Sequence, residues 1–179
     1  GHSHILSSTI PNCLSYDPTF SYEVAVIIKD GIQKMYVDQK NYFYYITTTN
    51  ENYEHPPMPK GAEEGIVKGM YKLIESKTPA IRLLGSGSIL NESIRAKSIL
   101  DNYGIESEIW SVTSFNLLRK DGMEVERYNQ LNPTKKEKQT YVEECFKNQS
   151  IPVIASTDYM RSYAEQIRPY INDDFTVLG

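Results

Sequence analysis

The stretch Ala80-Ile81-Arg82-Leu83-Leu84-Gly85-Ser86-Gly87-Ser88 decides the fold, because an apolar segment runs directly into a Gly/Ser turn. Apolar residues then recur at helical spacing from 89 to 103, and Gly104 supplies a helix stop. The apolar segment 108–113 follows and predicts a second strand. A strand, a helix and another strand in this order predict a parallel βαβ unit.

The same alternation continues to the end of the chain. Strands are predicted over 152–156 and 175–178. Helices are predicted over 115–120, 123–131, 141–147 and 159–168, with Ser114 capping the first and Pro169 ending the last. The fold class is therefore α/β, with a mostly parallel sheet covered by helices.

The first part of the chain predicts one helix and one strand. Residues 5–15 are rich in Ser and Thr and predict a loop or a short strand. A helix is predicted over 18–37, with Pro18 at its first position and Asp17 as its cap. The aromatic and β-branched segment 42–48 predicts a strand. A polar segment follows this strand, at the place where open α/β sheets bind ligands.

A proline-rich segment, His55-Pro56-Pro57-Met58-Pro59, marks the best domain boundary. Three prolines in four positions exclude a helix interior and predict a stiff connector. We therefore divide the chain into residues 1–57 and 58–179. A helix is predicted just beyond the connector, over 62–74.

Composition excludes several classes of function. The net charge is −4, which gives no reason to expect a nucleic-acid partner. No segment approaches the ~20 apolar residues that a membrane helix needs, and no signal peptide is visible. Cys13 and Cys145 lie far apart and fit no metal-ligand spacing, which suits a reducing cytoplasm.

Two features have the residue types of a functional site. The 85–88 turn lacks the spacing of known phosphate-binding loops, so a tight turn that needs small residues is the favoured interpretation. His2 and His4 alternate, so they would face the same side of an extended segment. Imidazoles handle protons near neutral pH, but no third metal ligand lies close by. Gly1-His2-Ser3 also matches residues left by a cloning vector.

Most of the chain resembles the homodimeric pyruvate dehydrogenase decarboxylating components, a family of the transketolase-like superfamily. The resemblance is carried, in the family's order, by segments 1–5, 10–18, 44–53, 58–66, 84–90, 110–115, 121–129 and 156–168. It implies that residues 1–57 are the end of a pyrimidine-binding domain for thiamine diphosphate. It also implies that residues 58–179 are an incomplete transketolase C-terminal-like domain.

The resemblance implies an oxidoreductase that decarboxylates pyruvate and passes the acetyl unit to a lipoyl group. The partners would be pyruvate, the lipoyl domain of dihydrolipoyl acetyltransferase and a second copy of the longer chain, in the cytoplasm. The family uses thiamine diphosphate and Mg²⁺, but its metal–diphosphate motif and its activating glutamate have no match here. The chain alone is therefore expected to hold neither cofactor nor metal, and to be inactive.

The resemblance also points to site residues. The superfamily has a Glu-Asp-Gly-x-x-His segment whose histidine lies over the cofactor, and Gly1 to His4 match its end. His4 is the expected catalytic imidazole and His2 the second choice, and a donor there would stabilise a developing alkoxide. Asn50 and Glu51 are expected at the mouth of the substrate pocket.

Two other interpretations remain open. Transketolases carry a Ser-Arg-Gln type sequence where this chain has Asn50-Glu51-Asn52, and a glutamate would repel a sugar phosphate. This difference favours a non-phosphorylated substrate, and a transketolase is kept as an alternative. The other alternative is a non-catalytic structural or dimerisation module.

Overall fold

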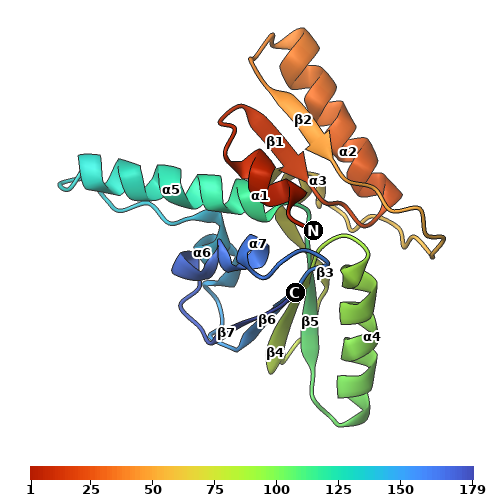
Figure 1. Cartoon of the computed structure of the whole chain (residues 1–179). Coiled ribbons are helices and arrows are strands. Elements are labelled where there is room, and N and C mark those ends of the chain that lie inside the picture. The colour runs from red at the N-terminus through yellow and green to blue at the C-terminus, as the bar shows by residue number, and fades with distance from the viewer.

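A computed structural model describes all residues, 1–179, as two sheets with helices around them (Figure 1). The larger sheet has the strand order β3-β5-β4-β6-β7. Its strands are β3 (Met70–Ile74), β4 (Ile81–Gly85), β5 (Ser107–Val112), β6 (Val153–Ser156) and β7 (Phe175–Leu178). All neighbours pair in parallel except β3, an antiparallel edge strand. The predicted α/β class with a mostly parallel sheet is confirmed.

Helices cover both faces of this sheet because neighbouring strand residues point to opposite sides. Leu83 and Ile109 pack with Leu90 of α4 (Ile89–Asn102) on one face. Leu84 packs on the other face in a cluster with Phe115 of α5. The helices on that second face are α5 (Phe115–Leu131), α6 (Tyr141–Phe146), α7 (Ser162–Glu165) and the 3₁₀ helix Arg168–Tyr170.

Four predicted elements in this part were wrong in extent. The helix predicted over 62–74 is α3 (Glu63–Lys68) followed by β3, because Gly69 adopts φ 117° and ends the helix. The two helices predicted over 115–131 are the single helix α5. The helix predicted over 159–168 is only α7, before the 3₁₀ turn that contains Pro169.

The smaller sheet pairs β1 (Cys13–Tyr16) in parallel with β2 (Phe43–Ile46). The crossover is α2 (Ser21–Ile32), which continues as a π-helix over Gln33–Val37. The predicted helix therefore exists but begins after Pro18, because the buried Glu23 carboxylate accepts the backbone N–H groups of Thr19 and Phe20. Asp17 does not cap this helix.

The first residues form a helix, α1 (Ser3–Ser8), where a loop or strand was predicted. Its position is fixed from far along the chain. Asn116 of α5 donates its side-chain amide to the carbonyl oxygen of His4 at 2.7 Å and to Ser15 Oγ at 2.6 Å. Local sequence therefore gave no signal for α1.

Hydrogen bonds join the two sheets directly. The backbone N–H of Asp17 donates to the carbonyl oxygen of Thr113 at 2.7 Å. Ser114 Oγ donates to the carbonyl oxygen of Ser15 at 2.6 Å, and Tyr16 Oη donates to that of Val67 at 2.9 Å. The carboxyl end of β1 is thereby attached to the loop after β5 and to α3.

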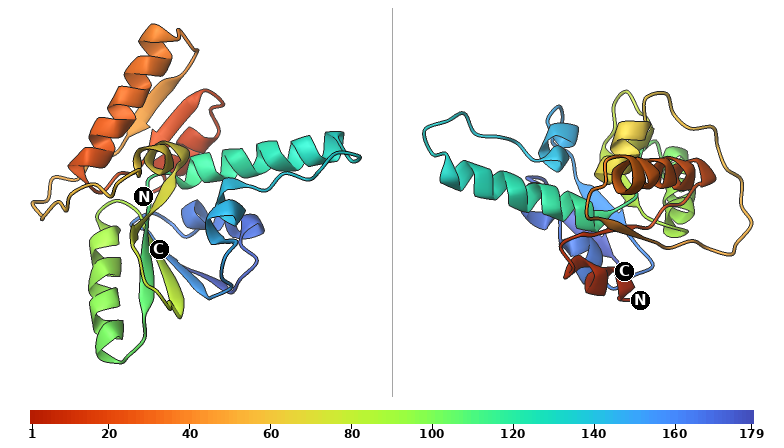
Figure 2. Two further views of the ribbon diagram at one scale, coloured as in Figure 1. Left: turned by 180° about the vertical axis from the view of Figure 1, so that it is seen from behind. Right: turned by 90° about the horizontal axis from the view of Figure 1, so that it is seen from above.

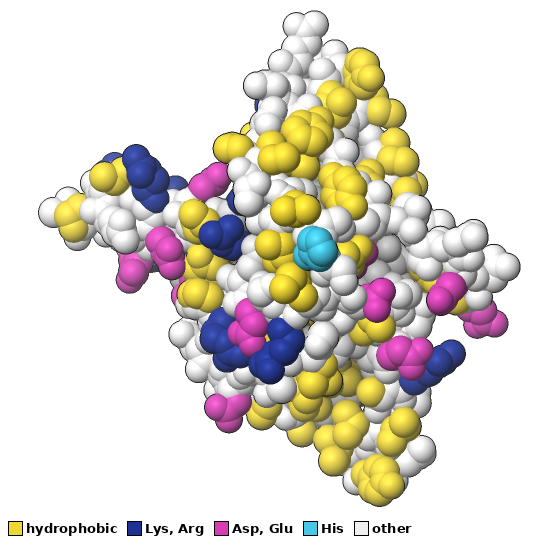
Figure 3. All heavy atoms as spheres, in the orientation of Figure 1, with side chains coloured by type: hydrophobic (Ala, Val, Ile, Leu, Met, Phe, Trp, Pro, Cys, Tyr) yellow, Lys and Arg dark blue, Asp and Glu magenta, His cyan; other side chains and the backbone are white.

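The surface has two further features. The far end of α5 projects from the body of the molecule in all views (Figure 2). Hydrophobic side chains of α2 and its π-helical extension are exposed, including Ile28, Ile32, Tyr36 and Val37 (Figure 3). None of the helices combines the length and the apolar character that crossing a membrane requires.

Candidate functional site

The carboxyl ends of parallel strands from both sheets meet at one place. Asp17 follows β1, Thr47 follows β2, Ser86 follows β4 and Thr157 follows β6. Ends of parallel strands are the usual ligand-binding edge of an open α/β sheet. We call these four residues, together with His4, the strand-end cluster.

His4 is fully buried in this cluster because α1 turns its side chain inward. Its Nε2 lies 3.0 Å from Thr47 Oγ1. The rings of Tyr45, Tyr159 and Tyr163 lie around the imidazole, with ring centroids 4.7–5.3 Å from its own. Burial lowers the pKa of His4 to about 4, so the imidazole is neutral at physiological pH. Access to it from outside requires one of these rings to move.

Asp17 is the charged group of the cluster. Its Oδ1 accepts a hydrogen bond from Thr47 Oγ1 at 2.6 Å. Burial raises the pKa of Asp17 to about 6, while the hydrogen bond from Thr47 and the nearby hydroxyl of Ser86 oppose the rise. The carboxylate lies against the turn after β4, where a Cβ atom on Gly87 would be 2.7 Å from Asp17 Oδ2.

The turn at 85–88 therefore has a packing role. Gly87 adopts φ 54° and leaves room for the Asp17 carboxylate. A carboxylate in this position would repel a phosphate, so the turn does not fit the diphosphate of a nucleotide-like cofactor. No group of three or more His, Cys, Asp or Glu side chains is placed to hold a metal ion.

Buried polar atoms without a partner concentrate in this region. Four buried side-chain N or O atoms have no hydrogen-bond partner within the protein. Two of them, His4 Nδ1 and Asp17 Oδ2, belong to the strand-end cluster, and a third is the Oη of Tyr163, which stacks on His4. Native proteins leave few such groups unpaired, so their concentration marks the cluster as a candidate site.

His2 lies outside the cluster. It is exposed at the start of α1, whereas His4 is buried. The two imidazoles therefore do not share one face as they would on an extended segment. A histidine is visible on the surface near the N-terminus (Figure 3).

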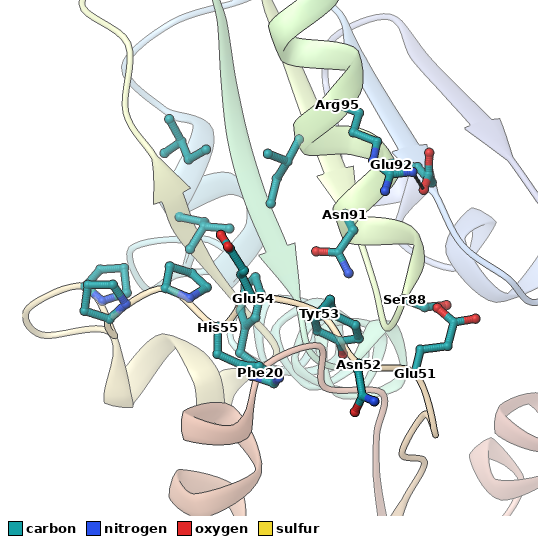
Figure 4. Close-up of a pocket in the computed structure, with 16 residues that line it drawn as sticks. Phe20, Glu51, Asn52, Tyr53, Glu54, His55, Ser88, Asn91, Glu92 and Arg95 are labelled. Atoms are coloured by element: carbon teal, nitrogen blue, oxygen red, sulfur yellow. Dashed lines mark hydrogen bonds and ion pairs between the residues drawn. The ribbon is translucent and has the colours of Figure 1, made fainter.

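Asn50 and Glu51 are exposed in the segment that follows β2. Glu51 lines a groove of about 620 Å³ between this segment and the start of α4 (Figure 4). His55 also lines the groove, stacks on Tyr53 and accepts the backbone N–H of Ser21 at 3.0 Å. This groove and the buried His4 are different places in the structure.

Comparison with known proteins covers every residue of the chain. Residues 1–56 match the pyruvate dehydrogenase E1 component middle domain, and residues 69–179 match the transketolase-like TK C-terminal domain. The pyruvate dehydrogenase E1 component of Pseudomonas aeruginosa is 58% identical over the whole chain, and that of Escherichia coli K12 is 53% identical. The chain belongs to the pyruvate dehydrogenase E1 component family. It spans 21% and 20% of the length of these two relatives.

Solved structures agree with the E1 family's fold. Transketolase from Pichia stipitis, in complex with sedoheptulose-7-phosphate, superposes with a TM-score of 0.63 at 16% identity, over 99% of this chain and 22% of its own. Transketolase from Campylobacter jejuni superposes with a TM-score of 0.64 at 16% identity, over 99% of this chain and 23% of its own. At this identity the likeness shows the transketolase-like fold alone.

Three residues of the strand-end cluster in this E1 family member were missed as site residues, namely Asp17, Thr47 and Thr157. Asp17 was interpreted as a helix cap, and Thr47 was part of a predicted strand. Both directly follow paired parallel strands, a position that the sequence did not mark because the strand predicted over 42–48 includes Thr47.

Proposed function

We propose that this chain forms part of the active-site region of an enzyme that decarboxylates pyruvate and transfers the acetyl unit to a lipoyl group. One observation carries the proposal: the chain aligns over its whole length, at 46–58% identity, with proteins named pyruvate dehydrogenase E1 component. Domain division at the proline connector, a homodimer and a cytoplasmic location belong to the same proposal.

Thiamine diphosphate would supply the electron sink for decarboxylation, and Mg²⁺ would hold its diphosphate. The residues of this chain do not fit either group, because the 85–88 turn faces a carboxylate and no acidic cluster forms a metal site. We therefore assign cofactor binding to parts of the relatives that this chain does not span. Isothermal titration of the 179-residue chain with thiamine diphosphate and Mg²⁺ should show no binding, and micromolar affinity would contradict this assignment.

His4 is the proposed catalytic imidazole, with His2 as the second choice. A buried, neutral imidazole with an unpaired Nδ1 supports His4, because such a group can exchange a hydrogen bond with a reacting atom. Asn50 and Glu51 are proposed to line the approach for substrate. The exposed carboxylate of Glu51 at the groove disfavours a phosphorylated substrate.

The test uses the intact enzyme with thiamine diphosphate and Mg²⁺. We expect carbon dioxide release from pyruvate, measured with an artificial electron acceptor, and at least a ~10²-fold loss of kcat in His4→Gln. His2→Gln is the matched comparison and should lose less. Turnover of sugar phosphates without turnover of pyruvate would favour the transketolase alternative. Wild-type activity in both histidine variants would remove the site assignment.

A further inference from the structure

The hydroxyl of Thr47 lies between a carboxylate and an imidazole. Thr47 Oγ1 is 2.6 Å from Asp17 Oδ1 and 3.0 Å from His4 Nε2. A hydroxyl has one proton, and a carboxylate oxygen can only accept it. The short distance and the charge of the acceptor direct the Thr47 proton toward Asp17. Thr47 then offers only a lone pair to His4, so His4 Nε2 must carry the ring proton.

The surroundings of His4 keep the imidazole neutral. The groups that face it are Thr47 and the phenol rings of Tyr45, Tyr159 and Tyr163, and the one charged neighbour, Asp17, lies beyond Thr47. A neutral ring with its proton on Nε2 has a bare acceptor at Nδ1. Nδ1 is buried and has no partner within the protein. A buried polar atom without a partner costs about 1–3 kcal/mol, so this acceptor is available to a ligand.

Asp17 is held firmly enough to set this arrangement. Its backbone N–H donates to Thr113, and its carbonyl oxygen accepts the N–H of Gly87 at 3.1 Å. The carboxylate packs against the turn at Gly87, where an added Cβ atom would lie 2.7 Å from Oδ2 and 2.9 Å from Oδ1. The carboxylate therefore points at Thr47 from a fixed backbone.

We propose that Asp17 and Thr47 are positioning residues that hold His4 as the Nε2–H tautomer, so that Nδ1 accepts a hydrogen bond from a hydroxyl or thiol group bound at the site. This inference rests on the proposed function of His4, and it reverses the donor role that the family resemblance implied. A tautomer held by a carboxylate through hydrogen bonds is a known way to fix the role of a catalytic imidazole. Here the Thr47 hydroxyl carries the effect from Asp17, after β1, to His4 of α1.

Neutron diffraction from deuterium-exchanged crystals of the intact enzyme tests the tautomer without any measurement of activity. We expect a deuteron on His4 Nε2 and the Thr47 deuteron directed at Asp17. In Asp17→Asn the new amide can donate to Thr47, which frees the Thr47 hydroxyl to donate to Nε2 and should move the ring deuteron to Nδ1. A deuteron on Nδ1 in the wild-type enzyme would overturn the proposal.

Kinetics of the intact enzyme test the consequence for catalysis. Thr47→Val should lower kcat for pyruvate by about tenfold or more, with KM changed less than twofold, because tautomer control is lost. Thr47→Ser should restore most of the rate. Thr48→Val is the matched control, because Thr48 is exposed, and it should be unchanged. The proposal fails if Thr47→Val retains wild-type kcat. A wild-type enzyme that ignores pyruvate would instead refute the proposed function and leave the neutron result standing.

Discussion

Replacement of Gly122 by alanine tests the packing between α5 and the 3₁₀ turn at 168–170. A Cβ atom at Gly122 would lie 2.1, 2.2 and 2.6 Å from three carbon atoms of the Tyr170 ring. Ordinary carbon contacts are about 3.5–4.0 Å apart, so either the ring or the helix must move. Overpacking of a core costs about 1–3 kcal/mol, and this overlap belongs at the upper end.

A second effect of the same substitution has the opposite sign. Alanine favours a helix interior over glycine by about 1 kcal/mol, and Gly122 lies within α5. The expected net loss for Gly122→Ala is therefore about 2 kcal/mol, which in a chain of this length lowers Tm by about 4–8 °C. Gly31→Ala in α2 is the matched control, because its new Cβ would lie at ordinary contact, 3.4 Å from the Tyr44 ring. This control should gain about 0.5–1 kcal/mol.

Urea unfolding of the chain, followed by circular dichroism, measures both changes. The double variant Gly122→Ala/Tyr170→Ala isolates the clash, because without the ring the alanine should no longer destabilise the protein. If Gly122→Ala proves as stable as the wild type while Gly31→Ala behaves as expected, α5 and Tyr170 do not pack as described.

Two further predictions concern charged groups. Arg82 is buried and donates from Nε to Glu108 Oε1 at 2.6 Å. Arg82→Met removes this partner from a buried carboxylate and should destabilise the chain by about 3–5 kcal/mol in urea unfolding. Arg95 forms only an exposed ion pair, so its loss should change stability by less than about 1 kcal/mol. Burial lowers the pKa of His4 from 6.5 to about 4, so the stability that neutral His4 contributes is lost as pH falls from 6.5 toward 4. Burial raises the pKa of Asp17 from 3.8 to about 6, so the stability that protonated Asp17 contributes is lost as pH rises through 6. Compared with wild type, Asp17→Asn should therefore lose more Tm on acidification from pH 6.5 to 4 and His4→Gln should lose less; equal slopes in all three proteins would contradict the burial of both groups.

The elements that sequence predicted well are those whose pattern is complete within the element. Strand β4 is an apolar run that ends in Gly85, and α4 has regular apolar spacing up to Gly104. Strand β3 was missed because Met70 and Leu73 fit the helical spacing that starts at Ala62. Only the backbone conformation of Gly69 separates the two elements.

The strand-end cluster depends on tertiary structure, so little of it was predicted from local patterns. His4 was identified through a family resemblance, and no pattern in residues 1–5 required it to be buried. Thr47 and Asp17 lie 30 residues apart and meet only because β1 and β2 pair in parallel. The strand predicted over 42–48 already includes Thr47, and no strand was predicted to end at Tyr16, so the strand ends that bring the two residues together were not visible in the sequence.

The hydrogen bonds between β1 and the loop after β5 have a mechanical consequence. Rotation of the first sheet against the second would have to break the Asp17–Thr113, Ser15–Ser114 and Tyr16–Val67 bonds, each of which stabilises by about 1 kcal/mol. The proline connector is thus not a hinge, even though the residues before and after it match two different family models. Any movement that opens the region around His4 should come from the tyrosine-bearing segment 158–163, not from swinging one sheet away from the other.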